Sequence, residues 1–448
     1  MRAFIKKYVN SKQIPKILFI FSLCALVFSY GFITSYKKWF PYSLVKEAVL
    51  YIQEINSEPE SRWYYTKTNY TTKIPVYDES SAYNGLSLVT SMLEEDKLSV
   101  RVIDMEGQTI HEWDIDWFVL WPDATHIPES DPDYPISQPG TNINGTLLLE
   151  NGDIIFNFAN LGLIRLDICG NVVWRLAYRT HHILYLDEFG ILWVPGMIRH
   201  LEPLPGFPNH TPPFIEFTVL KVSLDGEVLN EISVLDVLKE NDLLGLLNLS
   251  SQGGRIVNVT GDTLHLNDVE TFPSNLEEGV FKAGDIMISL RNINTVLIFR
   301  EEDLKVTYVS TGTFVRQHDP DFIDGNTISV FDNYNIAPRD YGHNSKIQIM
   351  SFADGEHYTY YSGNEEHPFY TSVMGTHEWL PNGNLLITES IKGRVFEIDL
   401  QGNIVWEFIN LAGDGYAGLV SDLHRLPVLY TEEFFDQLTQ RCSVEPSD

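Results

Sequence analysis

Histidine side chains recur at one position relative to a series of glycine turns. Two of them precede Gly190 by nine and eight residues, one precedes Gly325 by seven, and one precedes Gly383 by six. A fifth precedes Gly284 at a greater distance, because the segment VETFPSNLEEG is inserted between them. These histidines are His181, His182, His265, His318 and His377. Since imidazole can act as a nucleophile, acid or base near neutral pH, the set is a candidate catalytic centre.

Further polar side chains surround these histidines along the chain. They are Asn267 and Asp268 in HLND, Arg291 in SLRN, Gln317 and Asp319 in RQHDP, Asp332 and Asn333 in FDN, and Glu378 after His377. Arginine and asparagine stabilise charge that develops on an oxyanion, so this inventory favours an anionic group in transfer. Four imidazoles on one axis could instead hold non-haem iron, although an inward-pointing Arg291 would place a positive charge beside that cation. A third interpretation is structural, with buried histidines completing the hydrogen bonds of the fold.

A sequence repeat explains how such distant residues could meet. A glycine turn, an apolar strand, a second strand often ending in Asp, another turn and a third strand often closing on Trp appear six times. The turn glycines are Gly85, Gly152, Gly190, Gly284, Gly325 and Gly383. Each copy supplies three antiparallel strands without an intervening helix, too little to bury both faces alone, so the copies must stack. With the apolar stretch before each turn as a fourth strand, the repeat predicts an all-β, six-bladed β-propeller, with a pair of stacked sandwiches as the alternative.

The propeller makes a prediction about the histidines. All five fall in the strand that enters the glycine turn. One edge strand of each propeller blade lines the central channel, so equivalent positions in different blades converge on the axis. We therefore expect the histidines to lie together in the channel. The sequence contains no GxSxG, P-loop, GxGxxG or CxxC motif, so hydrolase-triad, nucleotide-binding and redox functions lack support.

Composition and charge limit the possible partners. The 448 residues are 44% hydrophobic and 12% aromatic, which excludes a disordered chain. Lys and Arg number 31 against 61 Asp and Glu, a net charge of -30, and such an acidic surface repels nucleic acid. Of the three cysteines, Cys24 lies in an apolar run, so at most Cys169 and Cys442 can pair, and the sequence does not decide whether they do.

The N-terminal region predicts a membrane anchor. Residues 17–35 carry no charge over 19 positions, enough for a helix to cross about 30 Å of hydrocarbon. The basic residues before this segment outnumber those after it, which places the N-terminus in the cytoplasm and everything after Lys37 outside, in a periplasm, at a cell surface or in a lumen. A cleaved secretory signal is the alternative. The predicted organisation is a basic tail and transmembrane anchor at 1–40, an amphipathic helix and linker at 41–82, and the propeller at 83–448.

Several motifs together resemble a known family. They are DMEGQTIHEW, the HH pair before LDEFGILWV, DTLHLNDVE followed by GDIMISLRN, and RQHDPDFIDGNTISVFDN. In type and order they resemble the arylsulfate sulfotransferase family, whose bacterial members are six-bladed propellers outside the cytoplasm. The resemblance spans residues 83–410 and indicates a divergent, membrane-tethered member.

The resemblance also implies a reaction and a set of roles. Such enzymes move a sulfuryl group from an aryl sulfate to a phenol through a sulfohistidine, in ping-pong fashion, without a nucleotide donor, a metal or another cofactor. By motif, His318 would be the nucleophile, and His182 would assist proton transfer. The sulfuryl oxygens would be bound by His265, Asn267 and Arg291. We expect further substrate contacts from His181, Gln317, Asn333 and His377, with no specific role derived for His377. The alternative functions are a non-catalytic propeller that binds a partner and a histidine-ligated, metal-dependent oxygenase.

Overall fold

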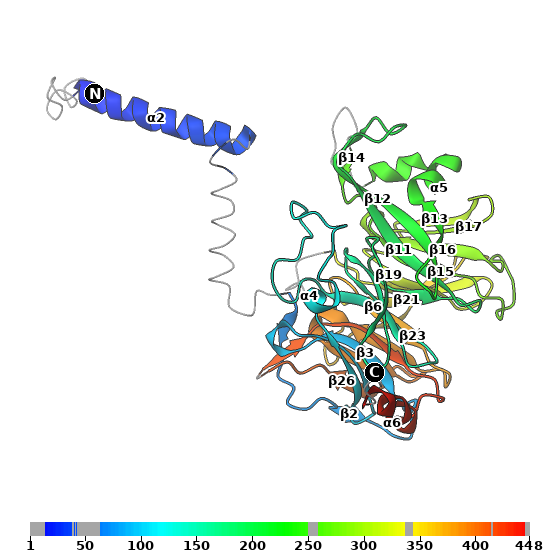
Figure 1. Ribbon diagram of the computed structural model, residues 1–448. Coiled ribbons are helices and arrows are strands. Elements are labelled where there is room, and N and C mark those ends of the chain that lie inside the picture. Colours follow the sequence, from blue (N-terminus) through cyan, green and yellow to red (C-terminus); the bar gives the residue numbers. More distant parts are fainter. Residues whose placement is uncertain are drawn as a thin grey trace, which may run out of the picture. The chain divides into compact units, whose positions relative to one another are not determined.

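Six sheets of four or five strands follow one another along the chain, as the repeat predicts, and their strands are antiparallel except for β14 (Val259–Gly261), which pairs in parallel with β12 (His210–Ser223). Figure 1 shows this six-bladed β-propeller in a computed structural model, which describes residues 14–37, 40, 42, 63–249, 259–336, 344–413 and 415–443. The chain divides into two compact units, residues 1–62 and residues 63–448, and the second contains the propeller.

Each blade is a meander in which neighbouring strands are hydrogen-bonded in the order that follows, from one edge of the sheet to the other. Blade 1 contains β28 (Val420–Arg425), β3 (Ser87–Met92), β4 (Leu98–Ile103) and β5 (Thr109–Ile115), and blade 2 contains β6 (Ile143–Leu148), β7 (Ile154–Phe158), β8 (Gly162–Leu166) and β9 (Val172–Leu176). Blade 3 contains β10 (Tyr185–Leu186), β11 (Ile191–His200), β12 (His210–Ser223) and β13 (Val228–Ser233), with β14 (Val259–Gly261) beside β12. Blade 4 contains β15 (Leu266–Thr271), β16 (Asp285–Leu290), β17 (Thr295–Arg300) and β18 (Val306–Thr311). Blade 5 contains β19 (His318–Phe322), β20 (Thr327–Asp332), β21 (Lys346–Ser351) and β22 (His357–Ser362), and blade 6 contains β23 (Thr376–Trp379), β24 (Leu385–Glu389), β25 (Arg394–Ile398), β26 (Ile404–Ile409) and β2 (Val76–Tyr77).

In the second unit the described helices are short, and they lie between strands except for the last two, which follow β28. They are α4 (Trp117–Leu120), α5 (Val234–Glu240) and α6 (Glu432–Thr439), with the 3-10 turns η2 (Glu94–Asp96), η3 (Leu244–Asn248), η4 (Arg291–Ile293), η6 (Ser390–Lys392) and η7 (Gln440–Ser443). Apolar side chains of the middle strands, such as Phe156, Phe299 and Phe396, are fully buried and form the core clusters.

The Asp and Gly of the repeat have a structural role in the hairpin turns. In the turn after β8, the carboxylate of Asp167 accepts hydrogen bonds from the main-chain N–H groups of Cys169 and Asn171 at 2.9 and 2.8 Å. Gly170 in the same turn has a φ of 82°, a left-handed conformation that glycine adopts without steric cost. The recurring Asp and Gly therefore mark turns between the third and fourth strands of a blade.

The irregular third copy of the repeat also forms a regular blade. Its long stretch between WVPG and HTPPF, which the sequence indicates as an insertion, continues β11 and β12 as a longer hairpin of 10 and 14 residues. The register runs unbroken from Ile191 opposite Ser223 to His200 opposite Phe214. The added residues therefore extend two existing strands.

The ring closes between the two ends of the propeller. The sequence pattern places the fourth strand of the first blade before Gly85, but the structure supplies it from the C-terminal side, where β28 pairs with β3. Figure 1 shows these segments side by side, orange-red against blue. Arg425 of β28 forms a fully buried ion pair with Glu397 of blade 6 at 3.2 Å and donates to Ser87 of β3 at 2.8 Å. Two segments that precede residue 83 also join the fold, because β1 (Tyr65–Lys67) pairs with β27 (Tyr416–Gly418) and β2 pairs with β26.

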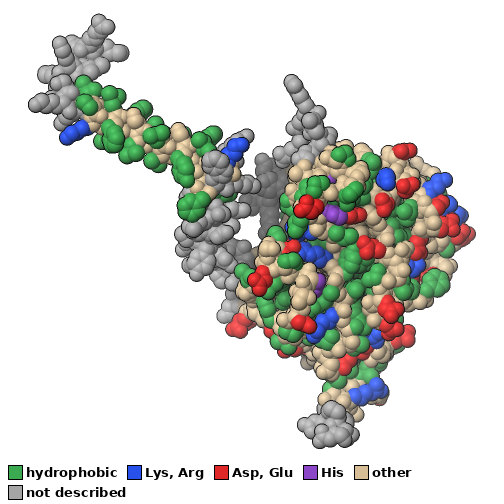
Figure 2. All heavy atoms as spheres, turned by 45° about the horizontal axis from the view of Figure 1, so that its top comes forward, with side chains coloured by type: hydrophobic (Ala, Val, Ile, Leu, Met, Phe, Trp, Pro, Cys, Tyr) green, Lys and Arg blue, Asp and Glu red, His purple; other side chains and the backbone are tan. Residues whose placement is uncertain are grey.

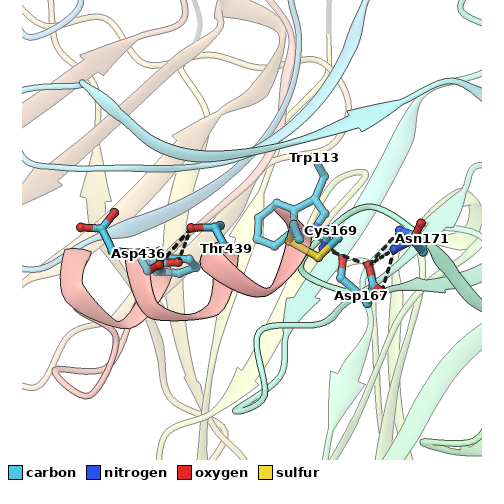
Figure 3. The surroundings of a disulfide bond; sticks show 8 residues. Trp113, Asp167, Cys169, Asn171, Asp436 and Thr439 are labelled. Carbon is cyan, nitrogen blue, oxygen red and sulfur yellow. Dashed lines mark hydrogen bonds between the residues drawn. A yellow bond between two sulfur atoms is a disulfide. The ribbon is translucent and has the colours of Figure 1, made fainter. Parts of the chain in front are cut away.

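Cys169 and Cys442 form a disulfide, which settles the question that the sequence left open. Figure 3 shows that the bond connects the turn after β8 with the segment that follows α6, close to Trp113, whose indole N–H donates to the Asp167 carbonyl at 3.0 Å. The bond joins residues 273 positions apart and holds the C-terminal segment against blade 2.

The first unit contains one strongly apolar helix, α2 (Ile14–Lys37). Its segment Ile14–Ser35 is 22 residues long, contains an 18-residue stretch with a mean hydropathy of 2.3, and is long enough to cross a membrane. Figure 2 shows hydrophobic side chains along its surface. The amphipathic helix expected around residues 44–52 lies outside the described residues.

Candidate active site

Four of the five histidines lie together. His318 is the first residue of β19, His265 immediately precedes β15, and His181 and His182 lie shortly before β10, so all four are at the start of the first strand of a blade. The ring centroids of His182 lie 4.8 Å from His181, 4.9 Å from His265 and 5.9 Å from His318, and His181 lies 6.0 Å from His265. We call these residues the imidazole cluster.

The backbone around the cluster is held in an uncommon conformation. His182 and His265 have φ angles of 63° and 54°, in the left-handed region that non-glycine residues seldom adopt. The main-chain N–H of Arg291 in η4 donates to the carbonyl of His265 at 3.0 Å, and the side chain of Asn157 donates to the carbonyl of His182. Such conformations cost about 1–3 kcal/mol each and persist where surrounding contacts enforce them, often at functional sites.

The hydrogen bonds of His318 determine which ring nitrogen carries its proton. The amide Nδ2 of Asn333 donates to the carbonyls of Met374 and Thr371 at 2.7 and 3.0 Å, so its Oδ1 must be the atom that faces His318. This oxygen lies 2.6 Å from His318 Nδ1, and because it can only accept, Nδ1 must donate. The lone pair of the neutral ring is therefore on Nε2, where the main-chain N–H of Met374 points from 3.3 Å.

The other three imidazoles are linked differently. The Nδ1 atoms of His181 and His182 lie 2.5 Å apart, so one donates to the other. Nδ1 of His265 hydrogen-bonds to the carboxylate of Asp262. The Nε2 atoms of His181 and His265 are buried and have no hydrogen-bond partner within the described chain. Buried polar atoms without a partner are rare, and here they are consistent with a site that a polar ligand completes.

Burial keeps the imidazoles neutral. It lowers the pKa of His318 to about 3, with the positive charge of Arg291 acting in the same direction. Burial, followed by the charge of His265, lowers the pKa of His181 to about 3, and the pKa of His182 is also well below its ordinary value for these reasons. At neutral pH the ring of His318 is therefore neutral, with an unprotonated Nε2.

Two arginines bring positive charge to the cluster. Burial, and next the neighbouring Arg316, lower the pKa of Arg291 to about 10, so its guanidinium stays charged at neutral pH. Both guanidiniums donate to Oδ1 of Asn292, from Arg291 Nε and Nη2 at 3.4 Å and from Arg316 Nη1. Within the described residues neither arginine forms an ion pair with a carboxylate. Asp262 is the carboxylate whose charge acts on Arg291, so two guanidinium groups face one carboxylate, and the cluster offers a net positive charge to an anion.

Two amide side chains predicted for the site, those of Asn267 and Gln317, form hydrogen bonds that connect neighbouring strands. Asn267 and Gln317 are fully buried, and Asn267 Nδ2 donates to the main-chain carbonyl of Gln317 at 2.8 Å. Gln317 Nε2 donates to Ser289 Oγ at 3.1 Å and to the carbonyl of Thr295 at 3.0 Å. Their side-chain carbonyl oxygens have no partner in the described chain. These bonds connect β15, β16 and β17 to the residue before His318.

His377 lies apart from the imidazole cluster, among carboxylates. Its Nδ1 is 2.8 Å from Asp319, and its Nε2 is 2.8 Å from Ser329 Oγ and 3.3 Å from Asp321. Burial raises the pKa of Glu270 to about 8, and burial together with neighbouring carboxylates raises the pKa values of Asp268 and Asp321 well above the ordinary range. The first strands of the blades thus present a second, acidic cluster, and the ring of His377 pairs with carboxylates of that cluster.

A large surface cavity lies elsewhere in the described part of the chain. It measures about 1240 Å³ and is lined by residues 66–70, residues 364–368 and nearby side chains, none of them from the imidazole cluster. Its arginine, Arg394, is already paired with Glu389 at 3.0 Å and with Glu407. The arginine of this cavity is balanced by two carboxylates, whereas Arg291 and Arg316 share one, so we place the candidate active site at the imidazole cluster.

Comparison with known proteins identifies the family of the chain. Residues 145–411 match the family described as arylsulfotransferase (ASST). That range covers more than half of the chain and includes every site residue predicted from the sequence. The chain belongs to the arylsulfotransferase family. No curated protein matches it.

Similarity to solved structures is low for this arylsulfotransferase. A protein of unknown function from Bacteroides caccae is 12% identical, with 76% of this chain and 98% of that chain covered and a TM-score of 0.44. TolB from Acinetobacter baumannii is 10% identical, with 77% and 68% covered and a TM-score of 0.41. The WD40 β-propeller domain of Doa1 is 9% identical, with 77% and 95% covered and a TM-score of 0.39. No functional conclusion rests on these similarities.

Three residues of the arylsulfotransferase site were not predicted from the sequence. They are Asp262, Asn292 and Arg316. Each lies within three residues of a predicted one, in DTLH, SLRN and RQHD, and that proximity is the one signal that could have indicated them. Proximity alone does not distinguish them from neighbours that point away.

Proposed function

We propose that this protein is an aryl-sulfate sulfotransferase that works through a sulfohistidine. In the first step the Nε2 lone pair of His318 attacks the sulfur of the donor, a bond from Nε2 to sulfur forms, and the bond from sulfur to the aryl oxygen breaks. The electron pair leaves with the phenolate. In the second step the oxygen of an acceptor phenol attacks the same sulfur, the bond to Nε2 breaks, and the phenol proton passes to a base. Donor and acceptor occupy the site in turn, which predicts ping-pong kinetics.

One observation carries this proposal. Asn333 holds the proton of His318 on Nδ1, so that the buried, neutral ring has its lone pair on Nε2 within a cluster that also contains Arg291. A nucleophile needs that lone pair, and a ring with this pKa does not lose it to protonation at neutral pH.

The surrounding charge suits a sulfuryl group. By analogy with phosphoryl transfer, the transition state is loose, and charge on the peripheral oxygens needs positioned donors more than covalent chemistry. Arg291 supplies a fixed positive charge next to His318, and we assign to it the binding of the sulfuryl oxygens. Asn267 acts indirectly, because its Nδ2 donates to the carbonyl of Gln317, the residue before His318. A second group of residues supports the site through hydrogen bonds, namely His181, Gln317 and Asn333.

The two alternative functions receive less support. An iron site would need ring nitrogens that converge on one point. In the described part of the chain, one group of residues has possible ligand atoms within 4.8 Å of one another, and it consists of Asp319, Asp321 and His377. This group lies outside the imidazole cluster. A propeller that only binds a partner does not require a nucleophile whose tautomer is held by a buried amide.

We also propose that the propeller works outside the cytoplasm, tethered by α2 with the N-terminus inside. The disulfide between Cys169 and Cys442 favours an oxidising compartment, because such bonds are rare in reducing ones. The apolar helix is compatible with a single-pass anchor and with a signal sequence.

Peptide mapping after exposure to p-nitrophenyl sulfate tests the reaction. We expect one sulfuryl adduct on the peptide that contains His318, a stoichiometric burst of nitrophenolate, and neither in His318→Gln. His357→Gln removes an exposed histidine of β22 and serves as the matched control, with the adduct retained. Retention of the burst in His318→Gln would refute the nucleophile, and loss of activity with chelators would favour the metal-dependent alternative.

A further inference from the structure

The second step needs a base, and two imidazoles beside His318 are possible candidates. The family resemblance points to His182, whose Nδ1 faces another imidazole, that of His181. A proton on His182 would be surrounded by His181, His265, His318 and Arg291, each of which disfavours it, and burial disfavours it further. No carboxylate among the described residues forms a hydrogen bond or ion pair with this ring to compensate.

His265 differs in one respect. It is the member of the imidazole cluster whose ring contacts a carboxylate, through Nδ1 to Asp262 Oδ2. Although burial acts to raise the pKa of Asp262, the hydrogen bond and charge of His265 and the charge of Arg291 hold it below its ordinary value, so Asp262 is ionised at neutral pH. An ionised carboxylate only accepts, so Nδ1 must donate to it. The lone pair of His265 is then on Nε2, which is buried and has no partner in the described chain.

We infer that Asp262 and His265 form the acid–base pair of the transfer, with Asp262 as the positioning residue. This inference rests on the proposed function. As the acceptor oxygen attacks the sulfur on His318, His265 Nε2 takes the phenol proton, and the ring becomes an imidazolium whose charge Asp262 balances. When a poorly leaving phenolate departs in the first step, the imidazolium returns that proton to the phenolate oxygen. A carboxylate that selects the tautomer and stabilises the imidazolium is the arrangement of a catalytic triad.

Several charged or titratable groups face His265, and a positive charge on any of them opposes its protonation. They are Arg291 on η4, Arg316 before β19, His181 and His182 before β10, and His318 on β19, against the single carboxylate of Asp262. Burial lowers the pKa of His265, and the hydrogen bond to Asp262 acts against this effect. Replacing the carboxylate therefore removes the one group that lets this ring hold a proton.

Asp262→Asn separates the two half-reactions of the full-length protein. With p-nitrophenyl sulfate the nitrophenolate leaves as an anion, so the burst and the adduct on His318 should stay within about threefold of wild type, because no acid is needed. Transfer from the adduct to phenol should fall ~100-fold or more, and acceptors that are already phenolates at the assay pH should recover most of the rate. Glu216→Gln is the matched control, because Glu216 pairs with His200 at 2.6 Å outside the cluster, and both half-reactions should remain unchanged.

The tautomer of His265 provides a readout that does not depend on turnover. In protein with ¹⁵N-labelled histidine, the wild-type ring of His265 should carry its proton on Nδ1, and in Asp262→Ala, which removes the acceptor of that proton, this preference should be lost. Transfer to phenol at the wild-type rate in Asp262→Asn, an equal loss of both half-reactions, or a wild-type ring protonated on Nε2 would each overturn the inference. These results differ from failure of the proposed function, in which no adduct forms on wild-type His318.

Discussion

Asn333→Ala tests how the structure prepares its nucleophile. The substitution removes three buried hydrogen bonds, one from His318 Nδ1 to Asn333 Oδ1 at 2.6 Å and two from Nδ2 to the carbonyls of Met374 and Thr371 at 2.7 and 3.0 Å. At about 1 kcal/mol for each bond, the free energy of unfolding should fall by about 3 kcal/mol. The ring of His318 also loses the acceptor that keeps its proton on Nδ1.

The loss of stability and the loss of chemistry are separable. Asn410 is also buried and makes a comparable set of bonds, accepting from Arg101 at 2.6 Å and donating to the carbonyls of Met92 and Gly418 at 2.8 and 2.9 Å, outside the imidazole cluster. Asn410→Ala should therefore lose a similar free energy of unfolding, measured by urea denaturation, and retain the wild-type nitrophenolate burst.

The burst rate of Asn333→Ala should fall about 10- to 100-fold, because the reactive tautomer is no longer enforced and the ring is free to turn. Stopped-flow absorbance well below the unfolding transition measures this rate. If Asn333→Ala and Asn410→Ala lose equal stability and both retain the wild-type burst rate, the tautomer argument is wrong.

Three further predictions follow from other parts of the structure. Arg316→Gln removes a positive charge that forms no ion pair with a carboxylate among the described residues. The KM for p-nitrophenyl sulfate should therefore rise about tenfold while the free energy of unfolding stays unchanged. An unchanged KM would contradict an anion-binding role for Arg316. The folded-state pKa of Glu270 is raised to about 8 above its ordinary 4.5, so the stability linked to its protonation is present below pH 4.5 and is lost as the pH rises through 8. Glu270→Gln should therefore be more stable relative to wild type at pH 9 than at pH 5 in paired urea titrations, and an equal difference at both pH values would contradict the raised pKa. Cys169→Ser should lower the free energy of unfolding by about 5 kcal/mol, as expected for a bond that closes a loop of this length, and Cys24→Ser is its control in the same denaturation experiment.

The repeat made most of the fold predictable. Alternating apolar residues and the Asp and Gly of each hairpin turn act over a few positions, so six copies of a three-strand unit indicated six blades before any contact was known. The same local logic placed His181, His182, His265 and His318 near the start of the first strand of their blades, and the structure brings these four rings together. The closing strand of the first blade was not predictable in this way, because β28 pairs with a strand more than 300 residues away.

The sequence by itself determined the propeller, the apolar N-terminal helix and the types of residue near the axis, because each depends on patterns within one repeat or one helix. The protonation pattern and the hydrogen-bond partners of those residues depend on the tertiary structure. The tautomer of His318 depends on Asn333, and through it on carbonyls of Thr371 and Met374, whereas His377 takes its partners from β19 and β20. A proton's position on an imidazole depends on which atoms lie within about 3 Å of each ring nitrogen. Residues far apart in the chain supply those atoms, so no local pattern can specify them.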